Sequence, residues 1–304
     1  PLPTGVKQLR DADMLIDIGG ITFADGRAMQ LLYNVFTIWP AMIMRVPVVK
    51  LSQAMGTFKK TSTKSLASYF LPRVKKIFSR GDLTTKYLKD LELDPDLVLP
   101  AADVAFSYEP SYSLSNENEA KLELVSAEII KASQAGKTVI SIIPSSLVLK
   151  NSRKLGQNYP DLILNLVVST LDRPVHFVFL PNGSREGSDG TMNNDLVAIQ
   201  AIRSLALAEL PEEVQKNITW VDFDINTRGV RELVALSDGL VTSRFHGMVA
   251  GLALCVPTMV IGWSHKYRET LHDFSMDEYA IDFKHEGLKI IKLYKRFIDN
   301  LPTI

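Results

Sequence analysis

Cysteine is nearly absent from this sequence, since Cys255 is the single cysteine among 304 residues. One cysteine excludes an intrachain disulfide framework and is typical of a protein in a reducing compartment. Because Cys255 ends an apolar stretch, we expect it to pack in the core. The first residues do not place a charged segment ahead of an apolar run, as a secretory signal would. We therefore expect a cytoplasmic protein.

An excess of positive charge is also missing, because 34 Lys and Arg balance 34 Asp and Glu. The composition therefore gives no reason to expect nucleic acid as a partner. The longest apolar passage, residues 31–49, is interrupted by Asn34, Pro40, Arg45 and Pro47. It predicts a core helix followed by a strand rather than a membrane span. Any membrane contact, at the inner face, is expected to be peripheral.

Several common catalytic and cofactor motifs are missing as well. The sequence contains no Gly-x-x-x-x-Gly-Lys-Ser/Thr phosphate loop, no Gly-x-Gly-x-x-Gly fingerprint and no Gly-x-Ser-x-Gly elbow. His265 and His272 have Glu269 and Asp273 nearby but match no recognised metal-ligand spacing. We therefore expect neither a resident metal nor a tightly bound cofactor.

Apolar strands alternate with helical segments along the whole chain, which predicts parallel sheets. Strands are expected at residues 13–18, 46–51, 76–79, 97–99, 138–143, 175–180, 218–221, 240–242, 258–261 and 279–282. The polar stretch 107–118 divides them. We expect an N-terminal α/β domain over 1–108 and a C-terminal one over 119–304, whose last helix crosses back. Two doubly wound, Rossmann-like domains facing a cleft would form a GT-B-like architecture.

The most informative stretch is residues 236–268, which predicts a strand, a helix rich in small residues and a second strand. If Ser243 caps this helix, Arg244 and His246 lie in its first turn with Gly247. Unpaired N–H groups and the helix dipole favour an anion there. Lys266 follows the next strand and so reaches the same sheet edge. The alternative is that Arg244 pairs with a neighbouring acid and His246 merely packs.

This stretch resembles the polysaccharide pyruvyl transferase family. The matching residues are Ser243-Arg244-Phe245-His246, Val256-Pro257 and Lys266. In the first half Gly19-Gly20, Ser52-Gln53-x-x-Gly56, Arg80 and Ala102-Asp103-x-Ala105-Phe106 recur in the family's order. Members usually begin with further strands, so the resemblance implies that the first domain lacks its N-terminal strands.

The resemblance implies a donor-binding group and an acceptor-side group. The donor-binding group is Ser243, Arg244, Gly247, Lys266, Ser145, Asn194 and Asp195, and the acceptor-side group is Gly19, Gly20, Gln53 and Arg80. Asn194-Asp195 fits equally well as a helix cap, and Arg80 and Asp103 fit structural capping roles. The family often has an arginine after the strand at 138–143, whereas this chain has Pro144-Ser145-Ser146, with Lys150 and Arg153 beyond.

The activity that the resemblance implies is pyruvyl transfer from phosphoenolpyruvate to a pair of glycan hydroxyls. His246 would be the general acid, and Arg244 and Lys266 would hold the donor. A helix N-terminus disfavours a charged imidazole, so His246 either acts in the donor complex or stays neutral and binds phosphate. The alternatives are a nucleotide-sugar glycosyltransferase or epimerase and a non-catalytic glycan-binding protein. The identity of the acceptor stays open, and so does whether it is lipid-linked. Whether the chain forms a homo-oligomer is also open.

Overall fold

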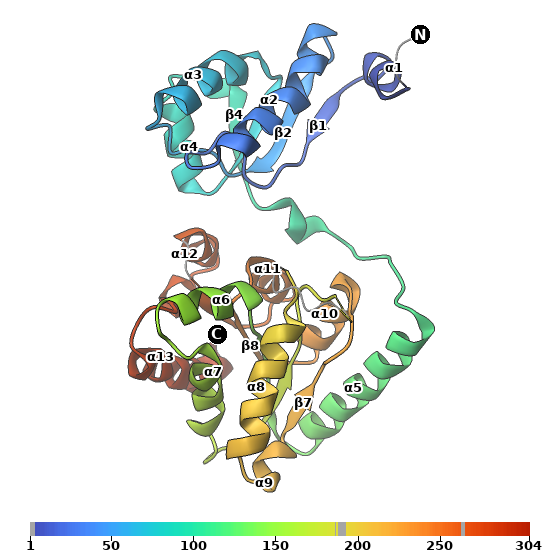
Figure 1. Ribbon diagram of the computed structural model, residues 1–304, viewed down its shortest axis with the longest axis vertical. Coiled ribbons are helices and arrows are strands. Elements are labelled where there is room, and N and C mark those ends of the chain that lie inside the picture. The colour runs from blue at the N-terminus through green and yellow to red at the C-terminus, as the bar shows by residue number, and fades with distance from the viewer. Residues whose placement is uncertain (1–3, 186, 188–192, 263–264) are drawn as a thin grey trace. The chain divides into compact units, whose positions relative to one another are not determined.

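The computed structural model describes residues 4–185, 187, 193–262 and 265–304 of the chain. The chain forms two compact units, Pro1–Ser107 and Tyr108–Ile304, and each contains a parallel sheet flanked by helices (Figure 1). The predicted α/β class with two parallel sheets is therefore confirmed. No helix in this part of the chain is both long and apolar enough to cross a membrane.

The first unit is built on a four-stranded sheet in the order β1-β2-β3-β4. Its strands are β1 (Leu15–Asp17), β2 (Val48–Gln53), β3 (Lys76–Arg80) and β4 (Val98–Ala101). Its helices are α1 (Thr4–Arg10), α2 (Ala28–Ile43), α3 (Thr61–Phe70) and α4 (Asp82–Lys89), with 3-10 turns at Leu71–Arg73, Pro95–Leu97 and Val104–Ser107. Its core includes Phe23, Ile38, Leu71, Ile77 and Leu88.

The second unit contains a six-stranded sheet in the order β10-β9-β8-β5-β6-β7. Its strands are β5 (Thr138–Ile143), β6 (Val175–Phe179), β7 (Ile218–Trp220), β8 (Gly239–Thr242), β9 (Thr258–Gly262) and β10 (Ala280–Asp282). Its helices are α5 (Asn116–Gln134), α6 (Ser146–Lys154), α7 (Tyr159–Val168), α8 (Leu196–Glu209), α9 (Glu212–Gln215), α10 (Thr227–Ala235), α11 (Phe245–Ala253), α12 (His265–His272) and α13 (Gly287–Asn300). Short 3-10 turns cover Asp277–Tyr279 and Leu301–Thr303.

Strand order places a topological switch point between β5 and β8. From β5 the chain moves outward to β6 and β7, then returns to β8 on the other side of β5 and continues to β9 and β10. Every pair in the sheet is parallel, so all six strands end at one carboxyl edge. Open α/β sheets bind ligands outside this edge at the switch point.

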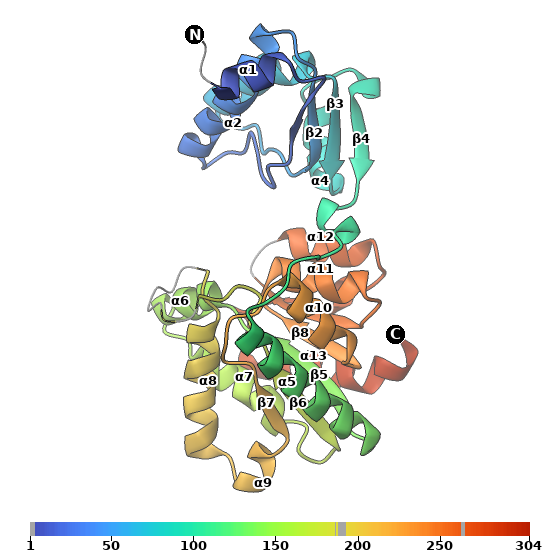
Figure 2. The ribbon, with the colours of Figure 1, turned by 90° about the vertical axis from the view of Figure 1, so that its right-hand side faces the viewer.

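Helices cover both faces of the second sheet, as parallel sheets require. Helices α7, α8 and α13 pack together on one face, while α5, α10 and α11 cover the other (Figures 1 and 2). The α5–α10 side contains a buried cluster that includes Ile129, Val139, Val178, Leu233 and Leu240. β6 and β9 are buried along their whole length, which explains their continuous apolar sequences.

Polar side chains fix where several helices begin. Ser115 accepts a hydrogen bond from Asn118 N at 3.2 Å and caps α5, whose first turn also carries Glu117 and Glu119. Asn226 caps α10 by accepting from Gly229 N at 3.0 Å. These caps satisfy N–H groups that the helix itself leaves unpaired, and the acidic residues complement the helix dipole.

Two helices that form part of the carboxyl edge were not predicted from the sequence. α6 carries a polar, basic end that lacks the apolar spacing of a core helix, and Ser145 caps it by accepting from Val148 N at 3.4 Å. α12 is also strongly polar. Neither helix has the long apolar repeat on which a prediction from periodicity depends.

Cys255 is exposed, so the expectation that it packs in the core is wrong. α11 ends just before it, and Cys255 adopts a left-handed conformation with φ 56°. Val256 N donates to Gly251 O at 2.9 Å, the bond that closes a Schellman motif. The turn directs the side chain outward, at a position where glycine is the preferred residue.

Replacing this cysteine tests the turn. We expect Cys255→Gly to raise the free energy of unfolding by about 0.5–1 kcal/mol, because glycine removes the left-handed strain. Chemical denaturation measures the change, and Cys255→Ser, which keeps the strain, serves as the matched control. A glycine variant no more stable than the serine variant would contradict this account.

A buried histidine in β6 makes the stability of the fold depend on pH. His176 is 3 % exposed, its Nε2 lies 2.8 Å from Thr219 Oγ1, and its Nδ1 has no hydrogen-bond partner among the described residues. Burial lowers the pKa of His176, and Lys137 adds to this while Glu128 opposes it. The unfolded chain therefore binds this proton more tightly than the folded one.

The sign of the pH effect follows directly. We expect the free energy of unfolding to fall as the pH drops below the unfolded histidine pKa, about 6.5, toward the lower folded pKa. The measurement is urea denaturation between about pH 7.5 and 5. His176→Gln should flatten this dependence. Identical curves for wild type and His176→Gln would refute the assignment.

Candidate functional site

The candidate site of the second unit lies where β5 and β8 end, at the switch point of the sheet. β5 leads into Ser145 and Ser146, and β8 leads into Ser243 and Arg244. Ser243 N donates to Ile143 O at 2.9 Å, which holds the two strand ends together. Gly183, which follows β6, and Asp195, at the start of α8, meet at the same edge.

A buried ion pair joins these segments. Arg244 Nε lies 2.9 Å from both carboxylate oxygens of Asp195, and Arg244 Nη2 donates to Ser146 Oγ at 3.0 Å. Asp195 also accepts from Ser146 N at 2.9 Å and from Gly183 N at 3.2 Å. The Asp195 side chain is fully buried, while that of Arg244 is 15 % exposed. Arg244 is therefore held in one orientation with part of its guanidinium at the surface.

Two buried tyrosines support the loop that carries Arg244. Tyr159 donates from its hydroxyl to Ser243 Oγ at 2.8 Å and accepts from Ser145 N at 3.3 Å. Tyr267 donates to Ser243 O at 3.3 Å. Burial raises the pKa of Tyr159 far above its usual value and that of Tyr267 to about 12. Both hydroxyls are therefore neutral donors that fix the loops after β5 and β8.

The helix after β8 begins one residue later than the sequence suggested. Arg244, not Ser243, is the N-cap of α11, and its φ of −115° and ψ of 134° are extended. Arg244 N donates to Thr242 Oγ1 at 3.0 Å, so a side chain before the helix satisfies this N–H. His246 and Gly247 lie in the first turn as expected, and His246 is exposed. A Cβ on Gly247 would meet Thr242 Oγ1 at 2.7 Å, so this turn packs directly on the strand end.

Lys266 lies beside the start of α11, although it belongs to α12. Its Nζ is 4.4 Å from the centre of the Phe245 ring and 5.7 Å from that of Tyr267. The Phe245 ring is itself 5.7 Å from the His246 ring. This cation–π contact keeps the ammonium group at the first turn of α11. The structure thus brings Arg244, His246 and Lys266 to one helix N-terminus.

Two other residues of the donor-binding group have clear structural partners. Ser145 caps α6 with its hydroxyl and is buried. Asn194 donates from Nδ2 to Arg185 O at 3.0 Å and accepts from Arg185 N at 3.2 Å, which ties the loop after β6 to the start of α8. Asp195 is the N-cap residue of α8 but makes no side-chain capping bond, because its carboxylate faces Arg244.

In the first unit, Gly19 and Gln53 meet in a separate polar cluster where β1 and β2 end. Lys50 Nζ lies 2.5 Å from Asp17 Oδ2, and the exposed fractions of these side chains are 0 % and 8 %. Asp17 also accepts from Gly19 N at 2.9 Å. Gln53 donates to Asp17 O at 2.6 Å and accepts from Thr22 Oγ1 at 2.6 Å. Burial acts to raise the pKa of Asp17, but the Lys50 charge and these hydrogen bonds hold it below its usual value.

Gly20 and Arg80 form the continuation of this cluster at the ends of β3 and β4. Arg80 forms an ion pair with Asp103, and its Nη2 donates to Gly20 O at 3.0 Å. Asp103 also accepts from Ala105 N at 3.0 Å. The bonds of Asp103 match the structural role that the sequence favoured for it.

Some residues at these two edges were not singled out from the sequence. Tyr159, Tyr267, Asp17 and Lys50 all occupy buried positions where the side chain makes a polar contact across the fold. For Lys50 a signal existed, because a lysine within an otherwise apolar strand requires a buried partner. The tyrosines carry no such signal, since their partners are set by packing alone.

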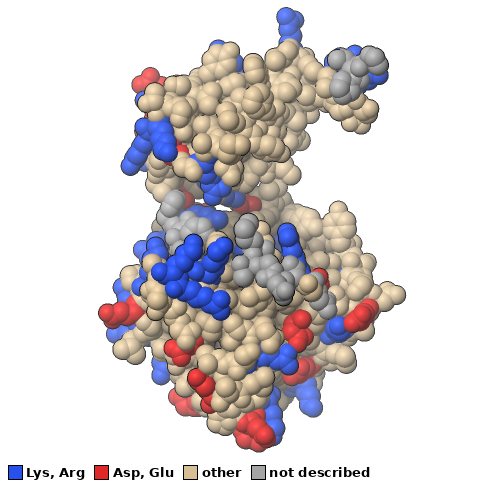
Figure 3. All heavy atoms as spheres, in the orientation of Figure 1, with Lys and Arg blue, Asp and Glu red and all other residues tan. Residues whose placement is uncertain are grey.

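Basic side chains gather over α6, at the same edge of the second unit (Figure 3). The helix carries Lys150, Arg153 and Lys154, and all three are exposed. Lys150 and Arg153 are the cations that the sequence offers in place of an arginine directly after β5. Among the described residues, no group of three or more His, Cys, Asp or Glu side chains could hold a metal ion.

Comparison with known families gives one match, to a family described as polysaccharide pyruvyl transferase. The match extends over residues 4–265 and therefore includes both edges described above. No curated protein matches the chain.

Solved structures match over nearly the whole chain but at low identity. The structure of MnaA from S. aureus with UDP is 11 % identical, with 98 % of this chain and 74 % of that chain covered and a TM-score of 0.58. A putative UDP-N-acetylglucosamine 2-epimerase from Listeria monocytogenes is 12 % identical, with 97 % of this chain and 70 % of that chain covered and a TM-score of 0.58. UDP-GlcNAc 2-epimerase from Methanocaldococcus jannaschii is 10 % identical, with 97 % of this chain and 76 % of that chain covered and a TM-score of 0.56. These likenesses concern the fold, which is GT-B-like.

Proposed function

Because the chain belongs to the polysaccharide pyruvyl transferase family, we propose that it transfers the pyruvyl group of phosphoenolpyruvate to two hydroxyls of a glycan. The product is a pyruvate ketal, and the setting is the synthesis of a cell-surface polysaccharide in the cytoplasm. One observation carries the proposal, namely the convergence of Arg244, His246 and Lys266 at the N-terminus of α11.

Donor binding follows from charge. Phosphoenolpyruvate carries a phosphate and a carboxylate, and both suit a helix N-terminus with a guanidinium and an ammonium group beside it. Arg244 is fixed by Asp195 and Ser146, so little conformational freedom is lost when it binds an anion. Asp195 neutralises part of its charge, and Lys266 restores a net positive potential at the site. The exposed cations of α6 attract the same donor.

The chemistry requires one proton for carbon and one for phosphate. A proton added to the methylene carbon of the donor makes the adjacent carbon electrophilic, and the first glycan hydroxyl attacks that carbon. Phosphate then leaves with the C–O electron pair, and the second hydroxyl closes the ketal. The two hydroxyl protons balance the one taken up by carbon and the one taken up by the departing phosphate. The products are the ketal and inorganic phosphate.

His246 is the group that we assign to protonation of the methylene carbon. Its exposed imidazole stands in the first turn of α11, within the same small region as the proposed anion clamps. The positive end of the helix disfavours a charged imidazole, whereas a bound dianion favours it. The acid role is therefore confined to the donor complex. A neutral His246 that only donates to phosphate is the competing assignment.

The glycan acceptor is proposed to meet the edge of the first unit. Gly19, Gly20, Gln53 and Arg80 belong to one polar cluster there, held by the Lys50–Asp17 pair. Carbonyl, amide and guanidinium groups at such an edge bind hydroxyls well. A lipid-linked acceptor would require only peripheral contact with the membrane.

The direct test supplies the full chain with phosphoenolpyruvate and a panel of hexose-containing oligosaccharides. We expect inorganic phosphate to be released only when a suitable acceptor is present, and the acceptor to gain a ketal detectable by mass spectrometry. If none of the acceptors leads to phosphate release and UDP stabilises the protein against heat, a nucleotide-sugar glycosyltransferase or epimerase would be favoured instead. Glycan binding without either effect would favour a non-catalytic glycan-binding protein.

A further inference from the structure

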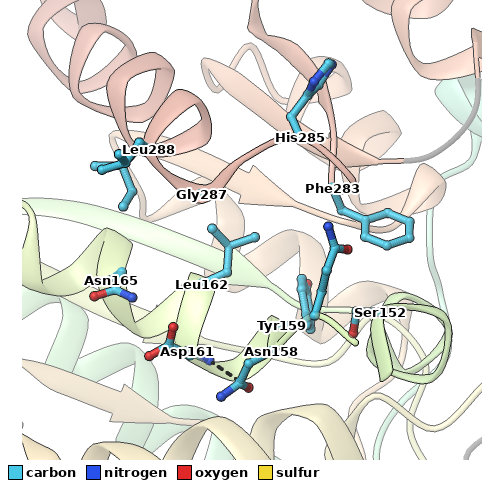
Figure 4. A pocket seen from close by; sticks show the side chains of 12 residues that line it. Ser152, Asn158, Tyr159, Asp161, Leu162, Asn165, Phe283, His285, Gly287 and Leu288 are labelled. Carbon is cyan, nitrogen blue, oxygen red and sulfur yellow. Dashed lines mark hydrogen bonds between the residues drawn. The ribbon is translucent and has the colours of Figure 1, made fainter. Parts of the chain in front are cut away.

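A cavity of about 400 Å³ lies in the second unit between residues of α6, α7 and α13 (Figure 4). It is lined by the end of α6, the first half of α7, the connection from β10 into α13, and the start of α13. Both α7 and α13 begin at the carboxyl edge of the sheet, so the cavity opens near the same edge as the donor site. Its volume is that of a pocket for a small organic ligand.

The polar groups of the cavity come mainly from amides. Gln157 and Asn165 line it, and so does the carboxylate of Asp161. Gln157 Nε2 donates to Lys284 O at 3.2 Å, whereas the buried Gln157 Oε1 accepts no hydrogen bond within the described chain. A buried acceptor without a donor costs free energy. The cavity thus presents an acceptor that a ligand O–H or N–H would satisfy.

Apolar side chains form the other walls of the cavity. Leu162 points from α7 toward the start of α13, where Leu288 lies at the rim (Figure 4). Leu288 is 79 % exposed, although it borders a cavity, and the Phe283 ring forms a further wall. The cavity therefore offers both C–H surfaces and amide groups to one occupant.

Charge separates this cavity from the donor site. Its described lining residues include no Lys or Arg, and Asp161 contributes a negative charge. His285 stands at the rim with its ring directed away from α7 (Figure 4). Phosphate and carboxylate ligands are therefore disfavoured here, in contrast to the N-terminus of α11.

From these features we propose that the cavity binds a neutral sugar ring. A pyranose has hydroxyls that both donate and accept, which matches amide and carboxylate side chains. It also has apolar C–H faces that pack on leucine and phenylalanine. That the ring belongs to the acceptor glycan rests on the proposed function, whereas binding of the ring itself does not.

Tyr159 connects the cavity to the donor site. It lines the cavity, while its hydroxyl donates to Ser243 Oγ, one residue before Arg244. The buried Tyr159 side chain thus joins the wall of the cavity to the loop that carries the donor clamp. This placement suits a subsite that holds one ring of a longer glycan while another ring reacts.

The test uses saturation-transfer NMR and titration with the methyl glycosides of glucose, galactose, mannose and N-acetylglucosamine, in the absence of phosphoenolpyruvate. We expect at least one glycoside to bind. Gln157→Ala and Asn165→Ala should each weaken that binding by about fivefold to tenfold, the effect of one uncharged hydrogen bond. Both side chains are only partly buried, so the variants should fold, which thermal unfolding checks.

One control variant keeps the result specific. Gln200→Ala, at an exposed position on α8, should bind the glycoside as wild type does. No binding by any of the four glycosides, or binding that both cavity variants leave unchanged, would overturn the proposal. If the wild-type protein binds a glycoside but does not bind phosphoenolpyruvate, that result would count against the proposed donor site alone.

Discussion

Arg244→Met is expected to lower the free energy of unfolding by about 3–5 kcal/mol, the usual cost of removing one partner of a buried ion pair. The loss arises because the Asp195 carboxylate, fully buried, would keep the N–H groups of Ser146 and Gly183 but lose its cationic partner. Chemical denaturation of the full chain measures it. Adding Asp195→Asn to Arg244→Met should recover part of the loss, since a neutral amide does not require the cation.

The matched control is an ion pair of the same type at the surface. Arg203 pairs with Asp222, and the exposed fractions of their side chains are 35 % and 51 %. Arg203→Met should therefore cost no more than about 1 kcal/mol. Equal losses in Arg203→Met and Arg244→Met would show that the Asp195 pair does not hold the site together.

His246→Ala is expected to reduce kcat for pyruvyl transfer by about 10²–10⁴-fold, the usual contribution of a general acid. KM for phosphoenolpyruvate should change little, because Arg244 and Lys266 remain to bind the donor. Stability should stay within about 0.5 kcal/mol of wild type, since His246 is exposed. Phosphate release under saturating acceptor measures the rate.

A second histidine serves as the control for His246→Ala. His272→Ala changes an exposed histidine at the last position of α12, and it should leave kcat unchanged. If His246→Ala instead raises KM and leaves kcat within a few-fold of wild type, the histidine binds phosphate and another group supplies the proton.

The central part of the candidate site was predictable because it is local in sequence. A strand that ends in Ser-Arg-Phe-His and continues as a helix places Arg244 and His246 at a helix N-terminus, whatever the rest of the fold does. Lys266 follows the neighbouring parallel strand, and parallel strands end at one edge. The exact cap was less predictable, because it depends on Thr242 accepting from Arg244 N.

The partners of these residues were not predictable to the same degree. Asp195 lies 49 residues from Arg244 in sequence, and helix capping explained Asn194-Asp195 equally well until the ion pair was seen. Tyr159 reaches Ser243 over 84 residues, through packing that no local pattern records. Long-range pairs of this kind depend on how the helices pack on the sheet.

At the level of the fold, continuous apolar strands identified both parallel sheets, whereas short polar helices escaped prediction. α6 and α12 stand over the carboxyl edge, where they do not need a long apolar face. Cys255 illustrates the same limit. The apolar pattern places its side chain in the core, but the left-handed turn at the end of α11 points it toward the surface. Elements at the edge of a core are therefore harder to predict than elements within it.

Binding of phosphoenolpyruvate to Lys266→Met tests the central claim most directly. Calorimetric titration should show binding to wild type, a loss of about tenfold or more in Lys266→Met from removal of a charged contact, and no change in Lys292→Met, an exposed lysine of α13. Equal affinity of all three proteins, or binding of UDP in place of phosphoenolpyruvate, would contradict a phosphoenolpyruvate site at the N-terminus of α11.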